Sequence, residues 1–247
     1  MLVRLPSAEG YAAQVPKEQK WLPILNINLN IQIPIPLHLG KPNENFPWHW
    51  SIYQFIPGES ANHLKLTNSE KCELANDLAN FSKSLHKAPT EGAPKGGLHN
   101  YYRGCHPSVY DKAARKDINT LAHMIDADKA VKTWEKALNS IWRTTPVWVH
   151  GDLAIGNLLI QNRKLCAVID FGCMAVGDPA CDLVMAWTYF DGEARQIFQN
   201  ALDMEIDVWD RAKGWALWKA AFELVEMKDK KSSDALQKLK IIDDVSL

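Results

Sequence analysis

The chain has 247 residues, an apolar fraction of 47% and a formal net charge of −1 at neutral pH. That length is enough for one large domain or two small ones with a sizeable core. The balanced charge does not indicate binding to nucleic acid or to a membrane surface. The five cysteines form no CxxC pair, and neither a signal peptide nor an apolar run of about 18 residues occurs, so we expect reduced thiols and a cytoplasmic location rather than export.

The first quarter of the chain predicts strands around one helix. Residues 2–5 predict a strand, and residues 11–25 predict a helix. Over residues 25–37 the odd positions are apolar and the even ones are Asn, Gln or Pro, which indicates an extended segment with one buried face. Its prolines exclude it from a central position in a sheet. Short strands are then predicted over residues 37–39 and 50–56.

The middle of the chain predicts helices. Thr67 and Glu70 have the spacing of a capping box, in which each side chain bonds the other residue's backbone N–H. Apolar residues then recur at helical spacing as far as Leu85, which predicts one buried stripe. Two more helices are predicted over residues 108–125 and 127–142.

A short strand and a loop follow. Residues 147–149 are β-formers and predict a buried strand. The motif His150-Gly151-Asp152 ends it, because glycine tolerates backbone angles that other residues avoid. Asp152 is therefore expected on a loop at a strand end, where catalytic groups are often held.

The next segment, NLLIQNRKLCAVID, predicts a hairpin of two apolar strands joined by a polar turn. A four-residue turn pairs Ile160 with Leu165 and brings Asn157 opposite Val168. Asp170 lies two residues beyond, roughly 7 Å along the strand.

This spacing suits one hard cation and one proton acceptor. Magnesium takes few protein ligands and completes its shell with waters and phosphate oxygens, so Asn157 and Asp170 suffice as its ligands. Asp152 precedes both in the same loop and is free to accept the proton of an attacking hydroxyl.

Beyond the hairpin the sequence predicts a helical tail. Apolar residues recur at helical spacing in four segments, residues 180–190, 193–202, 206–227 and 233–242. With the early strands, this predicts an α+β fold.

The ordered set of motifs resembles one known family. The motifs are His150-Gly151-Asp152, Asn157, Asp170-Phe171-Gly172, Gly177-Asp178-Pro179 and Asp182. The set is similar to that of the aminoglycoside phosphotransferase family, a branch of the protein-kinase-like fold. The resemblance implies a two-lobe fold, with a truncated small sheet lobe over residues 1–56 and a larger helical lobe with the catalytic hairpin over residues 57–247.

The resemblance also implies roles for the motif residues. Asp152 is the catalytic base, Asn157 and Asp170 are magnesium ligands, and ATP or GTP is the phosphate donor. Asp182 braces the catalytic loop from a following helix, although an acidic residue also suits a helix N-terminus. His150 either supports the loop through backbone hydrogen bonds or takes a direct chemical role.

Nucleotide-binding residues follow from the same resemblance. Arg4 matches the strand cation that steadies the phosphates, and Glu18 matches its carboxylate partner on the following helix. Family members often have Lys at the first position, and Arg keeps the charge with a two-pronged grip. Gln54, Phe55 and Ile56 match the hinge whose backbone pairs with an adenine edge.

The acceptor stays open at this stage. The resemblance allows an aminoglycoside, a macrolide, another amine or a sugar, and so leaves antibiotic resistance and housekeeping metabolism as alternatives. In relatives that modify polycationic sugars, carboxylates from the helical tail bind substrate ammonium groups. Asp191 and Glu193 lie nearest the motif in sequence and are the candidates for that role.

The related fold begins with two strands joined by a loop over the nucleotide phosphates, and no residues precede Met1 to build them. Either the chain is a truncated product, or it binds nucleotide without that lid. A sheet without those strands exposes an edge, which favours self-association.

Two other functions are alternatives to phosphotransfer. A non-catalytic, kinase-like remnant binds a ligand or partner without transfer, and the missing lid favours it. A metal-dependent hydrolase that uses His150, Asp152 and Asp170 requires a histidine-rich shell, and the motif region offers only His150.

Overall fold

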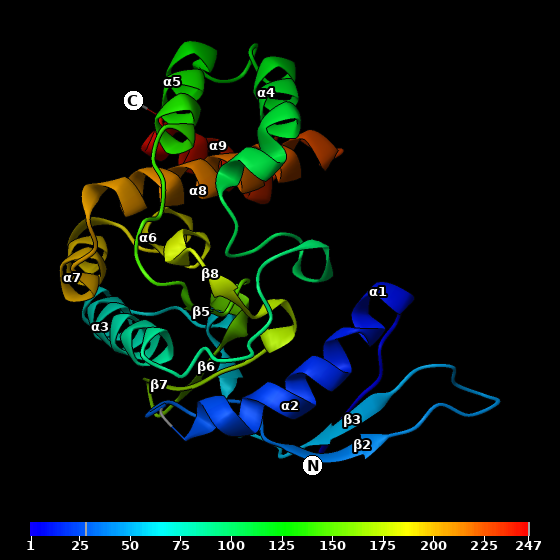
Figure 1. The fold of residues 1–247 in the computed structure, drawn as a ribbon. Coiled ribbons are helices and arrows are strands. Elements are labelled where there is room, and N and C mark those ends of the chain that lie inside the picture. Colours follow the sequence, from blue (N-terminus) through cyan, green and yellow to red (C-terminus); the bar gives the residue numbers. More distant parts are fainter. Residues whose placement is uncertain (28, 247) are drawn as a thin grey trace.

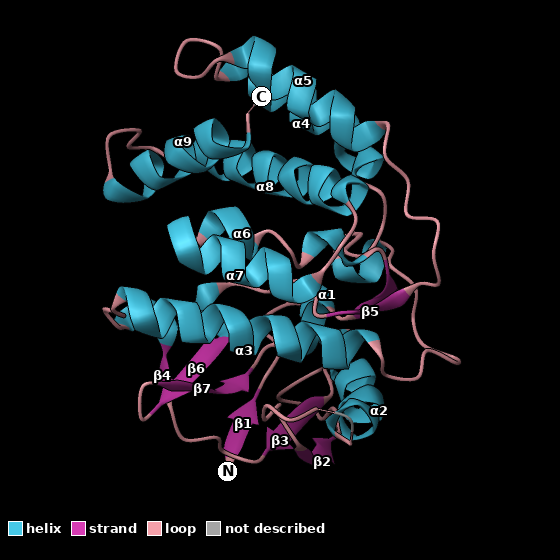
Figure 2. Cartoon of the chain, turned by 90° about the vertical axis from the view of Figure 1, so that its left-hand side faces the viewer, coloured by secondary structure: helices cyan, strands magenta, loops and turns pink. Residues whose placement is uncertain are grey.

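The computed structural model of the chain describes residues 1–27 and 29–246 (Figures 1 and 2). Helices and small antiparallel sheets make up the molecule, which confirms the predicted α+β class. The strands are β1 (Leu2–Arg4), β2 (Pro36–Gly40), β3 (Trp50–Tyr53), β4 (Glu59–Ser60), β5 (Val147–Val149), β6 (Leu158–Gln161), β7 (Lys164–Val168) and β8 (Ala175–Gly177). The helices are α1 (Glu9–Ala12), α2 (Gln14–Asn26), α3 (Asn68–His86), α4 (Asp111–Thr120), α5 (Ala127–Leu138), α6 (Met185–Thr188), α7 (Gly192–Leu202), α8 (Ile206–Glu226) and α9 (Ser233–Val245).

Three antiparallel sheets hold the strands. The first has the order β1-β3-β2 and lies beside α2 at one end of the molecule (Figure 1). The second has the order β4-β6-β7, and the third pairs β5 with β8. Strand β1 is at an edge of its sheet, with Leu2 and Val3 exposed. Such an edge is where the predicted self-association would occur, and that association stays a prediction.

The helices stack in successive layers above the sheets (Figure 2). α3 packs on α7 and on β5, while α8 contacts α4, α5 and α9. More than half of the 21 residues of α8 are buried, as expected for a helix that is apolar on most sides. No helix in the described part of the chain has the length and apolar composition needed to cross a bilayer.

The predicted start of α3 is confirmed. Thr67 accepts a hydrogen bond from the Glu70 backbone N–H, and the Glu70 carboxylate accepts one from the Thr67 N–H. The apolar stripe that follows, including Leu85, is buried. The helix therefore begins where its capping residues predict.

Three predicted features near the N-terminus are corrected. The helix expected over residues 11–25 is broken into α1 and α2, because the ring of Pro16 is incompatible with the carbonyl of the residue four positions earlier, Ala12. The extended segment expected from residue 25 begins later, because α2 continues to Asn26. Asn28, within that expectation, lies outside the described residues. The second strand, expected over residues 50–56, ends at Tyr53.

Later helices are shorter than predicted. The segment 108–125 opens as a 3₁₀ turn and is α-helical only over α4, and the segment 127–142 ends with α5 at Leu138. The segment 180–190 is α-helical only over α6, because Pro179–Cys181 forms a 3₁₀ turn in which the side chain of Asp178 caps Ala180. α7, α8 and α9 match their predicted segments closely.

The predicted hairpin is present as β6 and β7. Its two-residue turn is Asn162-Arg163, with positive φ angles of 51° and 66°. Those angles match the type I′ turn that suits the twist of paired strands. The predicted pairing of Ile160 with Leu165 is confirmed.

The register beyond that pair is corrected by one residue. Val168 pairs with Leu158 and not with Asn157, because Cys166 bulges out of the ladder. The Ile169 backbone N–H then donates to the Asn157 carbonyl oxygen at 2.9 Å. Asp170 therefore directly follows the residue bonded to Asn157, which brings the two candidate ligands closer along the hairpin than predicted.

Candidate active site

The loop after β5 is held by a buried carboxylate. Asp182 accepts hydrogen bonds from the backbone N–H groups of His150 at 2.6 Å and Gly151 at 2.8 Å. Gly151 has a φ of +84°, and a Cβ at this position would overlap the carbonyl oxygen of Cys173. Burial raises the pKa of Asp182 against the opposing effect of these donors. The geometry is that of a brace under the loop.

His150 is fully buried beneath the same loop. Its Nδ1 accepts the backbone N–H of Asp152 at 3.2 Å, and its Nε2 lies 2.9 Å from the carbonyl oxygen of Ile169. An Nδ1 that accepts requires the proton on Nε2, which then donates to Ile169. The ring also meets Phe171 edge to face, at 4.6 Å between centroids. Its contacts are thus those of a support between the loop and β7.

Asp152 is half-buried at the end of this loop and pairs with a residue of α8. Lys219 Nζ donates to Asp152 Oδ1 at 2.9 Å. Burial raises the pKa of Asp152, but Lys219, with smaller contributions from His150 and Arg103, lowers it further and leaves it below its usual value. Asp152 is therefore ionised at neutral pH and lies against a cation.

Asn157 and Asp170 lie side by side at the base of the hairpin. Asn157 Nδ2 donates to the Asp152 carbonyl oxygen at 2.9 Å, which leaves Oδ1 as its remaining polar atom. Asp170 has a left-handed backbone, with a φ of 66°, and its side chain is 47% exposed. One amide oxygen and one accessible carboxylate are hard donors of the kind magnesium takes in small number. The pair fits a magnesium ion that keeps waters and phosphate oxygens as its other ligands.

Arg4 joins Asp170 to α2. Its Nη2 donates to Asp170 Oδ1 at 2.6 Å, and its Nη1 donates to Glu18 Oε1 at 3.1 Å. Glu18 is only 2% exposed and also accepts a hydrogen bond from the Tyr53 hydroxyl. Burial raises the pKa of Glu18, and Arg4 beside it opposes that change. The cation is therefore held between two carboxylates from different parts of the fold.

A cavity of about 380 Å³ opens beside Arg4 and Asp170. Its lining includes the three expected hinge residues, Gln54, Phe55 and Ile56, together with apolar side chains of Leu2, Pro34, Leu159 and Ile169. The Gln54 backbone N–H is already bonded to the carbonyl oxygen of Ile35 at 2.9 Å. Most of the lining residues are apolar, and Arg4 and Asp170, which pair with each other, are its charged members.

Asp191 and Glu193 lie at the start of α7, the helix that packs on α3. Both residues are exposed. Glu193 lies beside Cys72 of α3, where it contributes to raising the pKa of that thiol after the larger effect of desolvation. The structure therefore places Glu193 beside α3.

Motif reasoning missed Lys219 and Tyr53. Lys219 is a lone cation in the apolar run WALWKAAF, and that isolation is the one signal the sequence offered. Tyr53 follows the alternation of β3, whose Ser51 and Tyr53 are buried. Their partners lie 67 and 35 residues away in the chain, beyond the reach of local patterns.

Among residues 1–27 and 29–246 there is no group of three or more His, Cys, Asp or Glu side chains placed to hold a metal ion. In the hydrolase alternative His150 is a metal ligand, whereas here its two ring nitrogens contact the Asp152 N–H and the Ile169 carbonyl oxygen. The Asn157–Asp170 pair is a different kind of site, with one amide and one carboxylate.

The phosphotransferase enzyme family model matches residues 1–215 of the chain. A comparison with curated protein sequences gives no significant match. The family match spans both the Arg4–Glu18 pair and the hairpin with Asn157 and Asp170.

Solved structures share the fold. The GDP and kanamycin complex of APH(2")-IIIa superposes with a TM-score of 0.72 at 20% identity, covering 98% of this chain and 85% of that chain. The streptomycin–ATP–APH(2")-IIa ternary complex gives 0.60 at 19% identity, covering 98% and 84%. A macrolide 2'-phosphotransferase type I gives 0.63 at 18% identity, covering 99% and 83%. These likenesses confirm the predicted kinase-like fold.

Proposed function

The chain belongs to the phosphotransferase enzyme family, and from that membership we propose that it transfers the terminal phosphate of ATP or GTP to a hydroxyl of a small molecule. The observation that carries the proposal is the position of Arg4 and Asp170 at the charged end of an apolar cavity. Asp152 lies in the adjoining loop, which also holds Asn157.

The cavity suits a nucleotide in one orientation. The base packs on Leu159 and Ile169, and the phosphates extend toward Arg4 and Asp170. Because Ile35 already occupies the Gln54 N–H, we assign the pairing with the base edge to the backbone of Phe55 and Ile56. Glu18 holds Arg4 in place, so that its guanidinium faces the phosphates without rearrangement.

Asn157 and Asp170 would hold a magnesium ion, which supplies charge neutralisation at the phosphates when bound. Asp152 accepts the proton of the acceptor hydroxyl. The acceptor oxygen then forms its bond to the terminal phosphorus as the bond to the bridging oxygen breaks, and the nucleoside diphosphate leaves. Asp182 and His150 keep Asp152 in position.

The acceptor class is the least constrained part. The similar structures carry the names of kanamycin, streptomycin and macrolides, which supports an antibiotic or another amine or sugar as acceptor and resistance as one outcome. Asp191 and Glu193 remain candidates for binding a cationic acceptor, although Glu193 lies beside Cys72 of α3. The division at residue 56 and the cytoplasmic location also remain predictions.

The first experiment replaces the proposed base. Asp152→Asn should lower nucleoside diphosphate formation from ATP or GTP with magnesium by about 10²- to 10⁴-fold, while nucleotide binding persists. The matched control is Asp128→Asn, which removes one exposed carboxylate from α5. Equal turnover in Asp152→Asn and the control would show that Asp152 is not the catalytic base.

A thermal titration with magnesium and nucleotide separates the enzyme from a non-catalytic remnant that has lost nucleotide binding. At about 100 times Kd, binding adds roughly 2.7 kcal/mol to the free energy of unfolding. For a chain of this size that raises Tm by about 5–11 °C. A flat titration would favour the remnant.

A further inference from the structure

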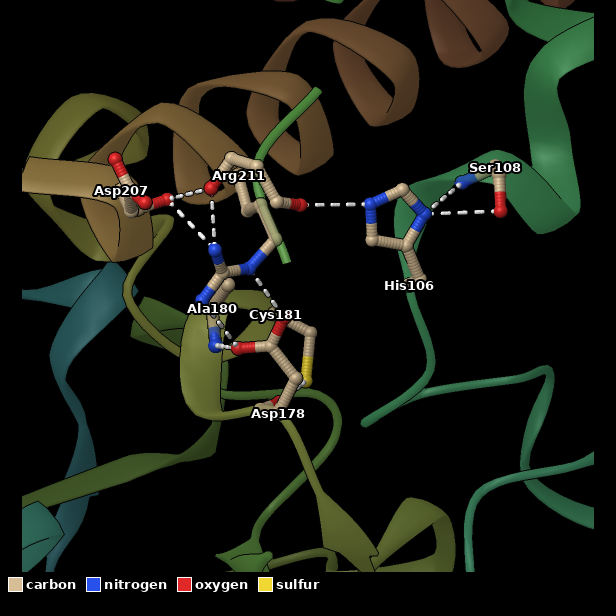
Figure 3. A network of polar contacts seen from close by, with 8 residues as sticks. His106, Ser108, Asp178, Ala180, Cys181, Asp207 and Arg211 are labelled. Atoms are coloured by element: carbon tan, nitrogen blue, oxygen red, sulfur yellow. Dashed lines mark hydrogen bonds and ion pairs between the residues drawn. The ribbon is translucent and has the colours of Figure 1, made fainter. Parts of the chain in front are cut away.

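Helix α8 is fixed in place before it reaches Asp152. Arg211 of α8 is fully buried, and its Nε donates to Asp178 Oδ2 at 2.6 Å (Figure 3). Its Nη1 donates to the Ser140 hydroxyl and to the Asp207 carbonyl oxygen. Arg211 and Asp178 form a buried ion pair, and Arg211 also donates to other partners. Such an arrangement is stable in only one geometry. The helix that carries Lys219 is thus fastened to the turn that follows β8.

The loop before α4 brings a second cation to the same place. Buried Asn100 donates to the carbonyl oxygens of Arg103 at 2.9 Å and Cys173 at 3.0 Å. The Asp178 N–H donates to the Gly104 carbonyl oxygen at 2.8 Å. Arg103 is therefore fixed between two anchors. Burial raises the pKa of Asp152, and Lys219, His150 and, to the smallest extent, Arg103 lower it.

Two features of this loop set it apart from an ordinary connection. Tyr101 and Tyr102 both have left-handed backbones, with φ of 54° and 55°, which is costly for residues with a Cβ and is typical of functional loops. The Arg103 guanidinium lies over the rings of Trp215 and Trp218, at 5.2 and 5.1 Å from their centroids. Aromatic faces thus back the second cation along the same helix as Lys219.

A third cation approaches from α2. Lys17 is half-buried, with its Nζ 3.4 Å from His99 Nδ1. Cys173 lies among Asp152, Arg103 and Lys17, and burial is the main cause that raises the pKa of its thiol to about 11. We call Lys219, which pairs with Asp152, and Arg103, which lies over two rings of the same helix, the acceptor side.

We infer that the acceptor is a hydroxyl compound that also carries an anionic group, a carboxylate or a phosphate, bound by Lys219 and Arg103 on the acceptor side. The inference rests on the proposed function and adds the acceptor's charge to it. Lys219 and Arg103 repel the positive charges of a polycationic acceptor. Such repulsion lowers the affinity for that acceptor and so contributes to specificity. Glu193, one of the two acidic candidates for such an acceptor, lies beside Cys72 of α3.

An anionic acceptor also activates the base. In the structure Lys219 donates to Asp152, which holds the proton acceptor in an ion pair. An anion that draws Lys219 to itself leaves Asp152 Oδ1 free to accept a hydrogen bond from the acceptor hydroxyl beside it. The acceptor's own charge thereby couples binding to proton transfer.

The test compares probes of different charge. Wild-type protein with magnesium and ATP or GTP is given D-glycerate, glycerol 3-phosphate, glycerol, choline or kanamycin, and nucleoside diphosphate formation is measured. We expect kcat/KM for the better anion to exceed that for glycerol by about tenfold or more, with the cations at or below glycerol. The two anions distinguish a carboxylate from a phosphate.

Variants of α8 locate the effect. Lys219→Met should lose most of the ratio of anion to glycerol, and Lys219→Arg should keep part of it, while Lys213→Met on the same helix serves as the matched control and keeps the ratio. If Lys219→Met lowers turnover equally for every acceptor, Lys219 acts on the transferred phosphate and the inference is wrong. A preference for kanamycin or choline would overturn it as well.

A binding measurement separates this inference from the proposed function. Calorimetric titration of both anions into the nucleotide-loaded protein should show binding that Lys219→Met weakens about tenfold or more. Failure of both anions to bind at millimolar concentration overturns the inference. Absence of nucleoside diphosphate formation that depends on Asp152, with every probe, overturns the proposed function instead, whatever the anions do.

Discussion

Two cations meet candidate carboxylates in this molecule, and the structure holds them differently. Arg4 donates to Asp170 at 2.6 Å and to the buried carboxylate of Glu18 at 3.1 Å, so it is fixed from two sides. Lys219 donates to Asp152 at 2.9 Å, and within the described residues this is its only ion pair. The nucleotide side, Arg4 with Glu18 and Asp170, is preorganised. On the acceptor side, Lys219 can leave Asp152 for another anion.

The difference indicates what each side does. A cation with a second, buried partner remains in place when a ligand binds, which suits the phosphates common to every donor nucleotide. A cation with one half-exposed partner can move to an incoming group, which suits a variable acceptor. The side chains of Arg4 and Lys219 are similarly exposed, at 37% and 33%, so the difference between the two sides comes from the second carboxylate, that of Glu18.

The largest expected effect comes from the anchor beneath the acceptor side. Arg211→Met leaves Asp178 buried without its partner, and breaking a buried ion pair costs about 3–5 kcal/mol. For a chain of this length that lowers Tm by about 6–20 °C. The measurement is thermal or urea unfolding.

Arg115→Met is the matched control, because it breaks only exposed ion pairs, with Asp111 four residues away and with Glu135. Exposed pairs contribute about 1 kcal/mol or less. Equal destabilisation by Arg115→Met and Arg211→Met would mean that α8 is not anchored through Asp178, and the rigid support for Lys219 would be lost with it.

The second effect is a contrast in nucleotide affinity. Glu18→Gln removes the buried anchor of Arg4 and should weaken nucleotide binding about 10- to 100-fold, since hydrogen bonds to charged groups contribute roughly 1.5–3 kcal/mol. Lys219→Met should change that affinity less than threefold (about 0.6 kcal/mol). Calorimetry with ADP and magnesium measures both. The reverse order of effects would exchange the roles assigned to the two sides.

The smallest effect is a shift of pH dependence. Lys219 holds the pKa of Asp152 below its usual value against the effect of burial. The pair therefore stabilises the fold above the ordinary carboxyl pKa, and that stability is lost as the pH falls through the lowered native pKa. In Lys219→Met the pKa rises, so the acid limb of the kcat/KM profile should move to higher pH.

The same profile offers its own control. Lys213→Met should keep the acid limb of the wild type, because Lys213 lies among Asp210, Lys136 and Arg195 and away from Asp152. An acid limb that stays in place in Lys219→Met would show that the titrating group is not the carboxyl paired with Lys219.

Local chemistry explains what the sequence predicted well. The two apolar runs at residues 158–160 and 165–169, the polar turn between them and the glycine at position 151 are short-range signals, and they predicted the hairpin and the loop that carries Asp152. The capping box at Thr67 and Glu70 predicted the start of α3 for the same reason. Their causes lie within about ten residues of the chain.

Long-range packing explains the rest. The bulge at Cys166 shifted the register of Asn157, and no pattern in the strand signals an unpaired residue. The helix expected over residues 180–190 is interrupted because the Asp178 side chain caps a turn. The Asp182 side chain accepts a hydrogen bond from the backbone of the loop after β5. The pairs of Lys219 with Asp152 and of Tyr53 with Glu18 join distant segments, which only the fold brings together.

A crystal structure with magnesium and a non-hydrolysable ATP or GTP analogue tests the central claim most directly. We expect the base between Leu159 and Ile169, the phosphates at Arg4 and Asp170, and the terminal phosphate facing Asp152. A nucleotide bound elsewhere, for example in the cavity of about 520 Å³ beside Met124 and Leu239, or a terminal phosphate turned away from Asp152, would contradict it.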